Sequence, residues 1–124
     1  VSPNVVGDYT ASADVGMCLI EDTCLSYHHC MPNKLFEYMM AGLPTVVSGL
    51  PEIARVVQDS GAGWVVPRWS PQSLRSTLLS IDADAIAAGR RGALDAARSF
   101  TWERQLPALR SVYERLALAR PECA

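Results

Sequence analysis

The sequence has little positive charge and no long apolar run. Its 124 residues include 11 basic and 13 acidic side chains, a formal net charge of −2, and only one of the bases is a lysine. Without an excess of positive charge to meet a phosphate backbone, we expect no nucleic-acid partner. The apolar runs, such as residues 15–20, are far shorter than the roughly 20 residues of a membrane-spanning helix. The first residues lack the charged start and apolar stretch of a signal peptide.

The composition is typical of a globular protein with one hydrophobic core. Hydrophobic residues make up 49% of the sequence and charged residues 19%, which argues against disorder. The four cysteines, at positions 18, 24, 30 and 123, do not form the loop-rich pattern of a small disulfide-stapled secreted domain. We therefore expect reduced thiols and a cytoplasmic location.

One cluster of residues contains potential metal ligands. Cys24, His28, His29 and Cys30 lie within seven positions, but their spacing does not match the paired ligands of a structural zinc site. Cys18 would supply a further ligand, yet it belongs to an apolar strand. We therefore expect no metal and no cofactor.

Apolar periodicity predicts alternating strands and helices. Short apolar runs predict strands at residues 15–20, 45–48 and 64–66, and a polar loop follows at residues 21–32. Helices are expected at residues 4–13, 33–41, 51–59, 71–79, 84–98 and from 102 onward. Asn4 and Asn33 are the expected N-caps of the first two helices. Leu35, Phe36, Met39 and Met40 give the helix at 33–41 an apolar face.

This alternation predicts an α/β fold with a parallel sheet and crossover helices. A doubly wound domain usually has about six strands, twice the number expected here. We therefore expect residues 1–124 to be a single partial Rossmann-like domain, with helices on both faces of its sheet. The strand at residues 15–20 would then have an exposed edge.

The helix expected to begin at Asn33 has features of a ligand site. It follows a loop that leaves the carboxyl end of a parallel strand, where α/β sheets bind ligands. The free N–H groups and positive dipole end of a helix start favour an anion such as phosphate, and Lys34 adds a cation. Glu37, three residues on, could accept hydrogen bonds from sugar hydroxyls. The alternative is an ordinary surface pair between Lys34 and Glu37.

Residues 32–48, P-N-K-L-F-E-Y-M-M-A-G-L-P-T-V-V-S, carry a longer pattern. They resemble the donor-binding motif of GT-B glycosyltransferases, in the retaining, group 1 class that uses nucleotide-sugar donors. Weaker matches in the same order extend the resemblance over essentially the whole chain, at residues 9–16, 50–53, 63–67, 70–74 and 100–102. It implies the C-terminal half of a GT-B donor domain.

The resemblance implies donor-binding roles for particular residues. Glu37 matches the family's second motif glutamate, which binds the ribose hydroxyls. His29 stands where the first glutamate, which helps hold the donor sugar, is expected. Pro32 replaces a glycine whose N–H is used in other members. Asn33 and Lys34 would contact the diphosphate or sugar, and Leu35 would offer a backbone N–H.

The resemblance also implies parts that this chain does not contain. Family members take an arginine and a lysine for the diphosphate from the first half of this domain, and bind the acceptor in a separate N-terminal domain. No catalytic residue is therefore assigned here, and the chain is expected to be inactive alone, with a UDP- or GDP-sugar as the donor of the parent enzyme.

Further expectations concern partners and alternative functions. Residues 101–119 are expected to pack on the missing N-terminal domain, and the uncovered helix and strand edge predict self-association of the fragment. The parent enzyme is expected to associate peripherally with a membrane. Two alternatives stay open: a non-catalytic GT-B-like binding or assembly module, and a sugar-nucleotide epimerase.

Overall fold

The computed structural model describes residues 2–118, which form an α/β fold on one parallel sheet. Strands β1 (Gly16–Cys18), β2 (Thr45–Ser48) and β3 (Gly63–Val66) are arranged in the order β1-β2-β3. Both pairings are parallel, with Val46 of β2 opposite Met17 on one side and Trp64 on the other. The prediction of three parallel strands in a partial Rossmann-like sheet is confirmed, and within the described residues β1 is an edge strand.

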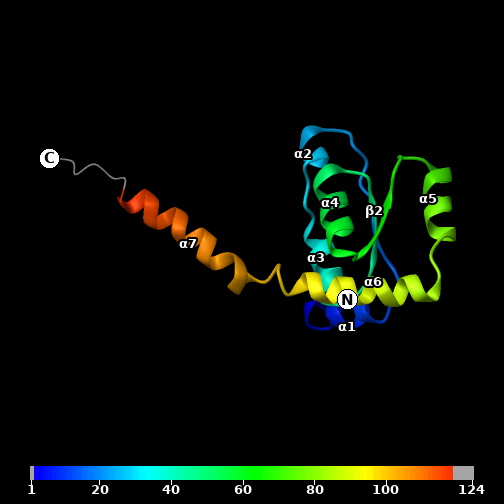
Figure 1. Cartoon of the computed structure of the whole chain (residues 1–124), viewed down its shortest axis with the longest axis horizontal. Coiled ribbons are helices and arrows are strands. Elements are labelled where there is room, and N and C mark those ends of the chain that lie inside the picture. The colour runs from blue at the N-terminus through cyan, green and yellow to red at the C-terminus, as the bar shows by residue number, and fades with distance from the viewer. Residues whose placement is uncertain (1, 119–124) are drawn as a thin grey trace.

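Helices surround the sheet on both sides. A 3-10 turn, η1 (Pro3–Val5), and α1 (Val6–Ala11) precede β1, and α2 (Leu25–His28) and α3 (Asn33–Met40) connect β1 to β2. Helix α4 (Pro51–Ser60) connects β2 to β3, and α5 (Pro71–Leu79), α6 (Ala83–Ala97) and α7 (Trp102–Leu118) follow. Figure 1 shows α3 and α4 on one side of the strands and α5 on the other.

The core lies between the sheet and the helices α3 and α4. Leu35 and Met39, one turn apart on α3, meet Ile53 and Val57, one turn apart on α4, against Val47 of β2. All five side chains are at most 1% exposed. Burial of a side chain of this size contributes about 1.5–3 kcal/mol, so this cluster fixes the position of α3 on the sheet.

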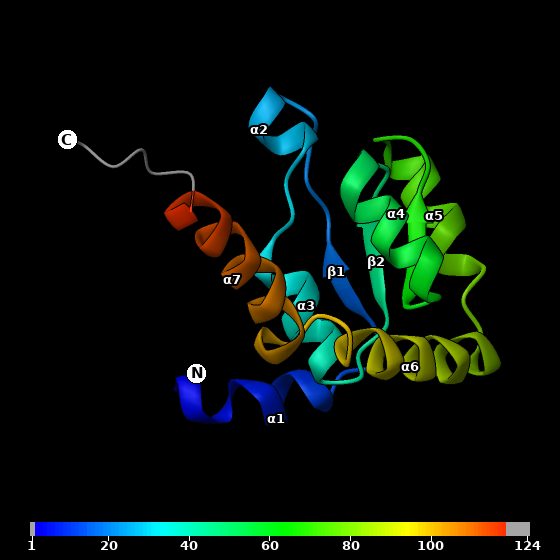
Figure 2. The same cartoon turned by 60° about the vertical axis from the view of Figure 1, so that its left-hand side comes forward.

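Helix α6 passes under the amino-terminal ends of the strands (Figure 2). Arg90 donates a hydrogen bond from Nη2 to the carbonyl oxygen of Ala13, just before β1, at 2.8 Å. A Cβ atom on Gly92 would lie 2.5 Å from the carbonyl oxygen of Gly61, just before β3, so only glycine allows this approach. The helix therefore braces the sheet at the edge opposite the strands' carboxyl ends.

Three local expectations are wrong. Asn4 does not cap a helix, because η1 intervenes and Val5 precedes α1. The loop at 21–32 contains the short helix α2. Met40 is 69% exposed, because its position on α3 points away from the buried face that carries Leu35 and Met39.

The N-cap of α3 also differs from the prediction by one residue. Asn33 is already helical, and Pro32 is the N-cap, with a φ of −73° and a ψ of 140°. The ring of proline fixes a φ that suits the extended backbone of an N-cap, and the N-cap side chain makes no hydrogen bond at this helix start. None of the helices in the described part of the chain is long and apolar enough to cross a membrane.

Candidate functional site

The candidate site lies at the edge of the sheet where the strands end. The segment after β1 leaves this edge, forms α2 and returns to begin α3 at Asn33. Figure 2 shows α2 at the far end of a loop that extends beyond the strands. Ligands of open α/β sheets bind outside the carboxyl ends of the strands, so the start of α3 is positioned as predicted for a binding site.

A single hydrogen bond joins the ends of β1 and β2. The N–H of Ile20 donates to the Oγ atom of Ser48 at 2.6 Å, and Ser48 is 4% exposed. This bond fixes the point from which the loop departs, because it satisfies a backbone donor beyond the end of β1. The sequence gives one signal of this role, a hydroxyl at the last position of an otherwise apolar strand, and the role was not predicted from it.

One exposed face of α3 carries the polar residues of the site. Asn33, Lys34 and Glu37 are all exposed, while Leu35 on the opposite face is fully buried. Residues three or four apart on a helix are neighbours, so these three side chains project on the same side. Among the salt bridges of residues 2–118, none involves Lys34 or Glu37. The alternative of a surface pair between them is therefore not what the structure contains.

The backbone N–H groups at the start of α3 are partly free. The N–H of Leu35 donates to the carbonyl oxygen of Pro32 at 3.1 Å. Those of Asn33 and Lys34 have no acceptor among the hydrogen bonds of the described residues. Two N–H groups and the positive end of the helix dipole therefore remain available to an anion, next to the Lys34 side chain.

His29 lies in the loop before α3, at the end of α2. Its ring meets that of His28 edge-on, with the ring centroids 4.7 Å apart. His28 in turn donates from Nδ1 to the carboxylate of Asp22 at 2.8 Å, which ties the two sides of the loop together. In the described range, no group of three or more histidine, cysteine, aspartate or glutamate residues is arranged to hold a metal ion.

Two thiols lie behind the start of α3. Burial raises the pKa of the Cys18 thiol, and the nearby Lys34 ammonium partly opposes that rise. Burial also raises the pKa of Cys30, which packs against the core. Cys24, by contrast, is exposed on the loop.

We expect the cysteines to react with iodoacetamide at very different rates. Cys24 should be alkylated at least about tenfold faster than Cys18 at pH 8, because the thiolate is the nucleophile and burial disfavours it. The rate at Cys18 should still be rising with pH where an ordinary thiol has levelled off, since its pKa is raised. Peptide mass spectrometry resolves each site and reads Cys123, outside the described residues, separately. Equal rates at Cys18 and Cys24 would contradict the arrangement.

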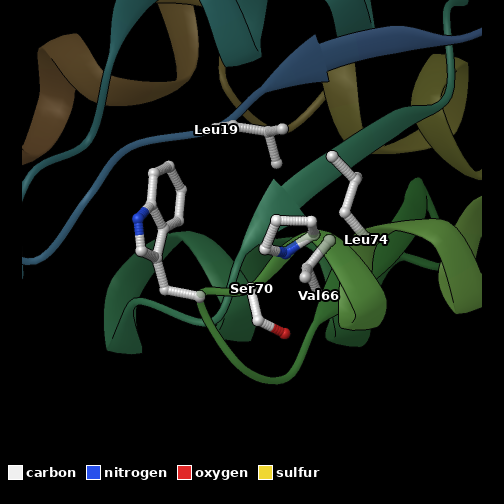
Figure 3. Close-up of a pocket in the computed structure, with 6 residues that line it drawn as sticks. Leu19, Val66, Ser70 and Leu74 are labelled. Atoms are coloured by element: carbon white, nitrogen blue, oxygen red, sulfur yellow. The ribbon is translucent and has the colours of Figure 1, made fainter.

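A groove lies on the face of the sheet opposite α3 (Figure 3). It has a volume of about 380 Å³ and is lined by Leu19, Val66, Trp69, Ser70, Pro71 and Leu74. The hydroxyl among its lining residues already has a role, since Ser70 Oγ accepts the N–H of Ser73 at the start of α5. This groove offers no convergent polar groups, so the exposed face of α3 is the stronger candidate site. No pattern in the sequence predicts the groove.

A family model described as glycosyl transferases group 1 matches residues 2–84. The matched range holds all three strands, helices α1 to α5 and every residue of the candidate site. No curated protein and no solved structure matches the chain significantly.

Proposed function

Because the chain belongs to the glycosyl transferases group 1 family, we propose that it binds the nucleotide-sugar donor of such an enzyme at the start of α3. The observation that supports this most is the unpaired state of Lys34 and Glu37. A cation and an anion three residues apart can pair on a helix surface. Here both stay open to solvent at the ligand-binding edge of the sheet, beside free N–H groups.

Each residue of the proposed site has a distinct role. The Glu37 carboxylate accepts hydrogen bonds from two ribose hydroxyls, which are pure donors toward it. Lys34 and Asn33, with their backbone N–H groups, face the diphosphate. The N–H of Leu35 already donates to the Pro32 carbonyl oxygen, so it can bind the donor only if it shares its hydrogen between that oxygen and the donor. His29 takes the sugar side, where its ring can donate or accept a hydrogen bond.

The charge of the chain supports an active site that is formed partly by this chain and partly by another part of the parent enzyme. Residues 1–67 have two bases, Lys34 and Arg55, against seven acids. Arg55 is paired with Glu52 on α4, which leaves Lys34 as the unpaired cation of this half among the described residues. One lysine does not balance a diphosphate, so further bases must complete the site. We place them, with the acceptor site, in the preceding part of the parent enzyme.

Titration of the chain with UDP- and GDP-sugars tests this proposal. Backbone amide resonances of residues 33–37 should shift on weak binding, with a dissociation constant of about 1 mM or weaker. The full-length gene product should bind more tightly and transfer the sugar to an acceptor. Rapid transfer by the isolated chain would contradict the division of the site.

Two other results would point to other functions. Failure of the full-length protein to bind any nucleotide would favour a non-catalytic binding module. Release of an altered sugar without an acceptor would favour an epimerase. Assays of nucleotide binding and of sugar product on the same preparation separate these outcomes.

A further inference from the structure

A line of contacts leads from the buried end of β2 to His29. It begins with the bond from the N–H of Ile20 to Ser48 Oγ, which is 2.6 Å long and lies at a residue that is 4% exposed. Ile20 also packs against the core, so the segment that leaves β1 is fixed at this residue. Beyond it the loop runs out past the strands to α2 before it returns to α3 (Figure 2). The position of the loop is therefore set at the point where it leaves the sheet.

A tight turn follows at once and sets the direction of Asp22. The N–H of Thr23 donates to the carbonyl oxygen of Glu21 at 2.9 Å. A hydrogen bond that runs back over two residues closes a γ-turn, and Asp22 is the central residue of this turn. Only Glu21 separates Asp22 from the anchored Ile20. The Asp22 carboxylate therefore has little freedom to move relative to the end of β1.

The Asp22 carboxylate holds His28 across the loop. His28 Nδ1 lies 2.8 Å from Asp22 Oδ2. A carboxylate only accepts hydrogen bonds, so Nδ1 of the histidine carries the proton. The backbone of His28 is fixed as well, because its N–H donates to the carbonyl oxygen of Cys24 at the start of α2, at 2.9 Å. The orientation of this ring is therefore defined.

His28 in turn restrains the ring of His29. The two ring centroids are 4.7 Å apart, and the ring planes make an angle of 88°. His29 is exposed, and no side-chain hydrogen bond within residues 2–118 involves its ring. The edge-on contact with His28 is therefore the main restraint on the orientation of His29.

We propose that Asp22 and Ser48 are positioning residues for the donor sugar, which act through the loop on His29. This inference rests on the proposed function, in which His29 takes the sugar side of the donor. Ser48 is buried and Asp22 is engaged by His28, so both act through His29 and not by contact with the sugar. A ring that is held in place beforehand loses less freedom on binding, and the complex with the nucleotide-sugar is favoured accordingly.

The ribose side of the site is held in a different way. Helix α3, which carries Glu37, is fixed by the burial of its apolar face in the core. Loss of the Asp22 or Ser48 contact should therefore disturb His29 and leave Glu37 in place. A nucleotide-sugar should then bind less tightly, while a nucleoside diphosphate without the sugar should bind as before. A general structural role would weaken both ligands alike.

Calorimetry on the full-length protein with UDP-glucose and UDP, and with GDP-mannose and GDP, tests the proposal. D22A and S48A should each weaken binding of the nucleotide-sugar by about fivefold, the factor that corresponds to one typical hydrogen bond. Each should change binding of the matching diphosphate less than about twofold. D22N keeps an oxygen that accepts from His28 and should restore most of the lost affinity.

E21A and S60A are the matched controls. E21A removes the neighbouring acid of the same loop, which forms no ion pair among the described residues. S60A removes the hydroxyl that donates to the carbonyl oxygen of Val56 at 2.6 Å, a part-buried bond at the end of α4. Both should change either affinity less than about twofold. In a double-mutant cycle, D22A should have little further effect in an H29A protein, because the residue through which it acts is gone.

The histidine rings give a readout that needs no donor. In the 124-residue chain at pH 8, nitrogen chemical shifts should show the proton of His28 on Nδ1, and D22A should abolish that preference and shift the ring protons of His29. Unchanged His29 resonances in D22A would overturn the proposal.

The binding data distinguish failure of this inference from failure of the proposed function. Normal binding of both ligands to D22A and S48A, or equal losses for both, would overturn the inference alone. A full effect of D22A in the H29A protein would do the same. Absence of binding of every nucleotide and nucleotide-sugar to the original full-length protein would overturn the proposed function, and this inference with it.

Discussion

Replacing Glu37 with glutamine should weaken donor binding by the full-length protein by about 30-fold. Glutamine keeps the shape of the side chain but removes its charge and one of its two acceptor oxygens. Hydrogen bonds to a charged group are worth about 1.5–3 kcal/mol, and a loss of about 2 kcal/mol corresponds to this factor. Glu37 is exposed and unpaired, so the melting temperature without donor should not change. Isothermal titration calorimetry measures the dissociation constant.

A matched control and a second ligand make this test specific. Glu52→Gln changes a carboxylate at the start of α4 that is already occupied by Arg55, and should alter affinity less than about twofold. Donors lacking a ribose hydroxyl should bind the original protein less tightly, but should lose little further affinity with the Glu37 variant. This coupling between residue and hydroxyl is the signature of a direct contact. Independent, additive losses would show that Glu37 acts elsewhere.

The sequence predicted the sheet and the placement of α3 because strong local signals agree there. Strand β2 was predicted with its observed bounds, since an apolar run lies between Pro44 and Gly49. Gly42 follows Ala41, the C-cap of α3, and has a φ of +66°, a conformation that glycine adopts without strain. These features are local, so a single sequence contains them.

What the sequence did not predict depends on contacts between distant residues. The bond from Ile20 to Ser48 joins positions 28 apart, and no local pattern marks it. Met40 fits an apolar helical pattern, yet the sheet and α6 take the neighbouring face and leave it exposed beside Glu37. Helix α2 is a single turn in a polar loop, too short to give a periodic signal. Tertiary packing decides the first two, whereas α2 is missed because of its length.

The exposure of Met40 has a consequence for the proposed donor site. It lies three residues after Glu37, so its thioether and methyl group stand next to the carboxylate on the same face. An exposed apolar side chain beside a sugar-binding carboxylate offers a surface for the face of a ribose ring. The apolar pattern of residues 33–41 therefore combines core positions with a position at the proposed ligand face.

The largest effect on stability is expected from Gly63→Ala. Gly63 opens β3 with a φ of +152°, a conformation that residues with a side chain rarely adopt. A Cβ atom there would lie 1.9 Å from the carbonyl oxygen of Thr45, the residue paired with it on β2. The contacting atoms belong to the backbone of Thr45 and not to a flexible side chain, so they cannot move aside. The two strands must therefore separate, or the peptide at residue 63 must rotate.

Strain of this backbone kind and overpacking each cost about 1–3 kcal/mol, so Gly63→Ala should lower the free energy of unfolding by about 4 kcal/mol. The melting temperature should fall by about 10 °C or more. Urea denaturation followed by circular dichroism measures the change. Gly7→Ala is the matched control, because no atom lies within 4 Å of its would-be Cβ and α1 should gain up to about 1 kcal/mol. A Gly63→Ala protein as stable as the original would mean that β2 and β3 do not approach as described. The edge of the sheet that positions α3 would then also differ from the description.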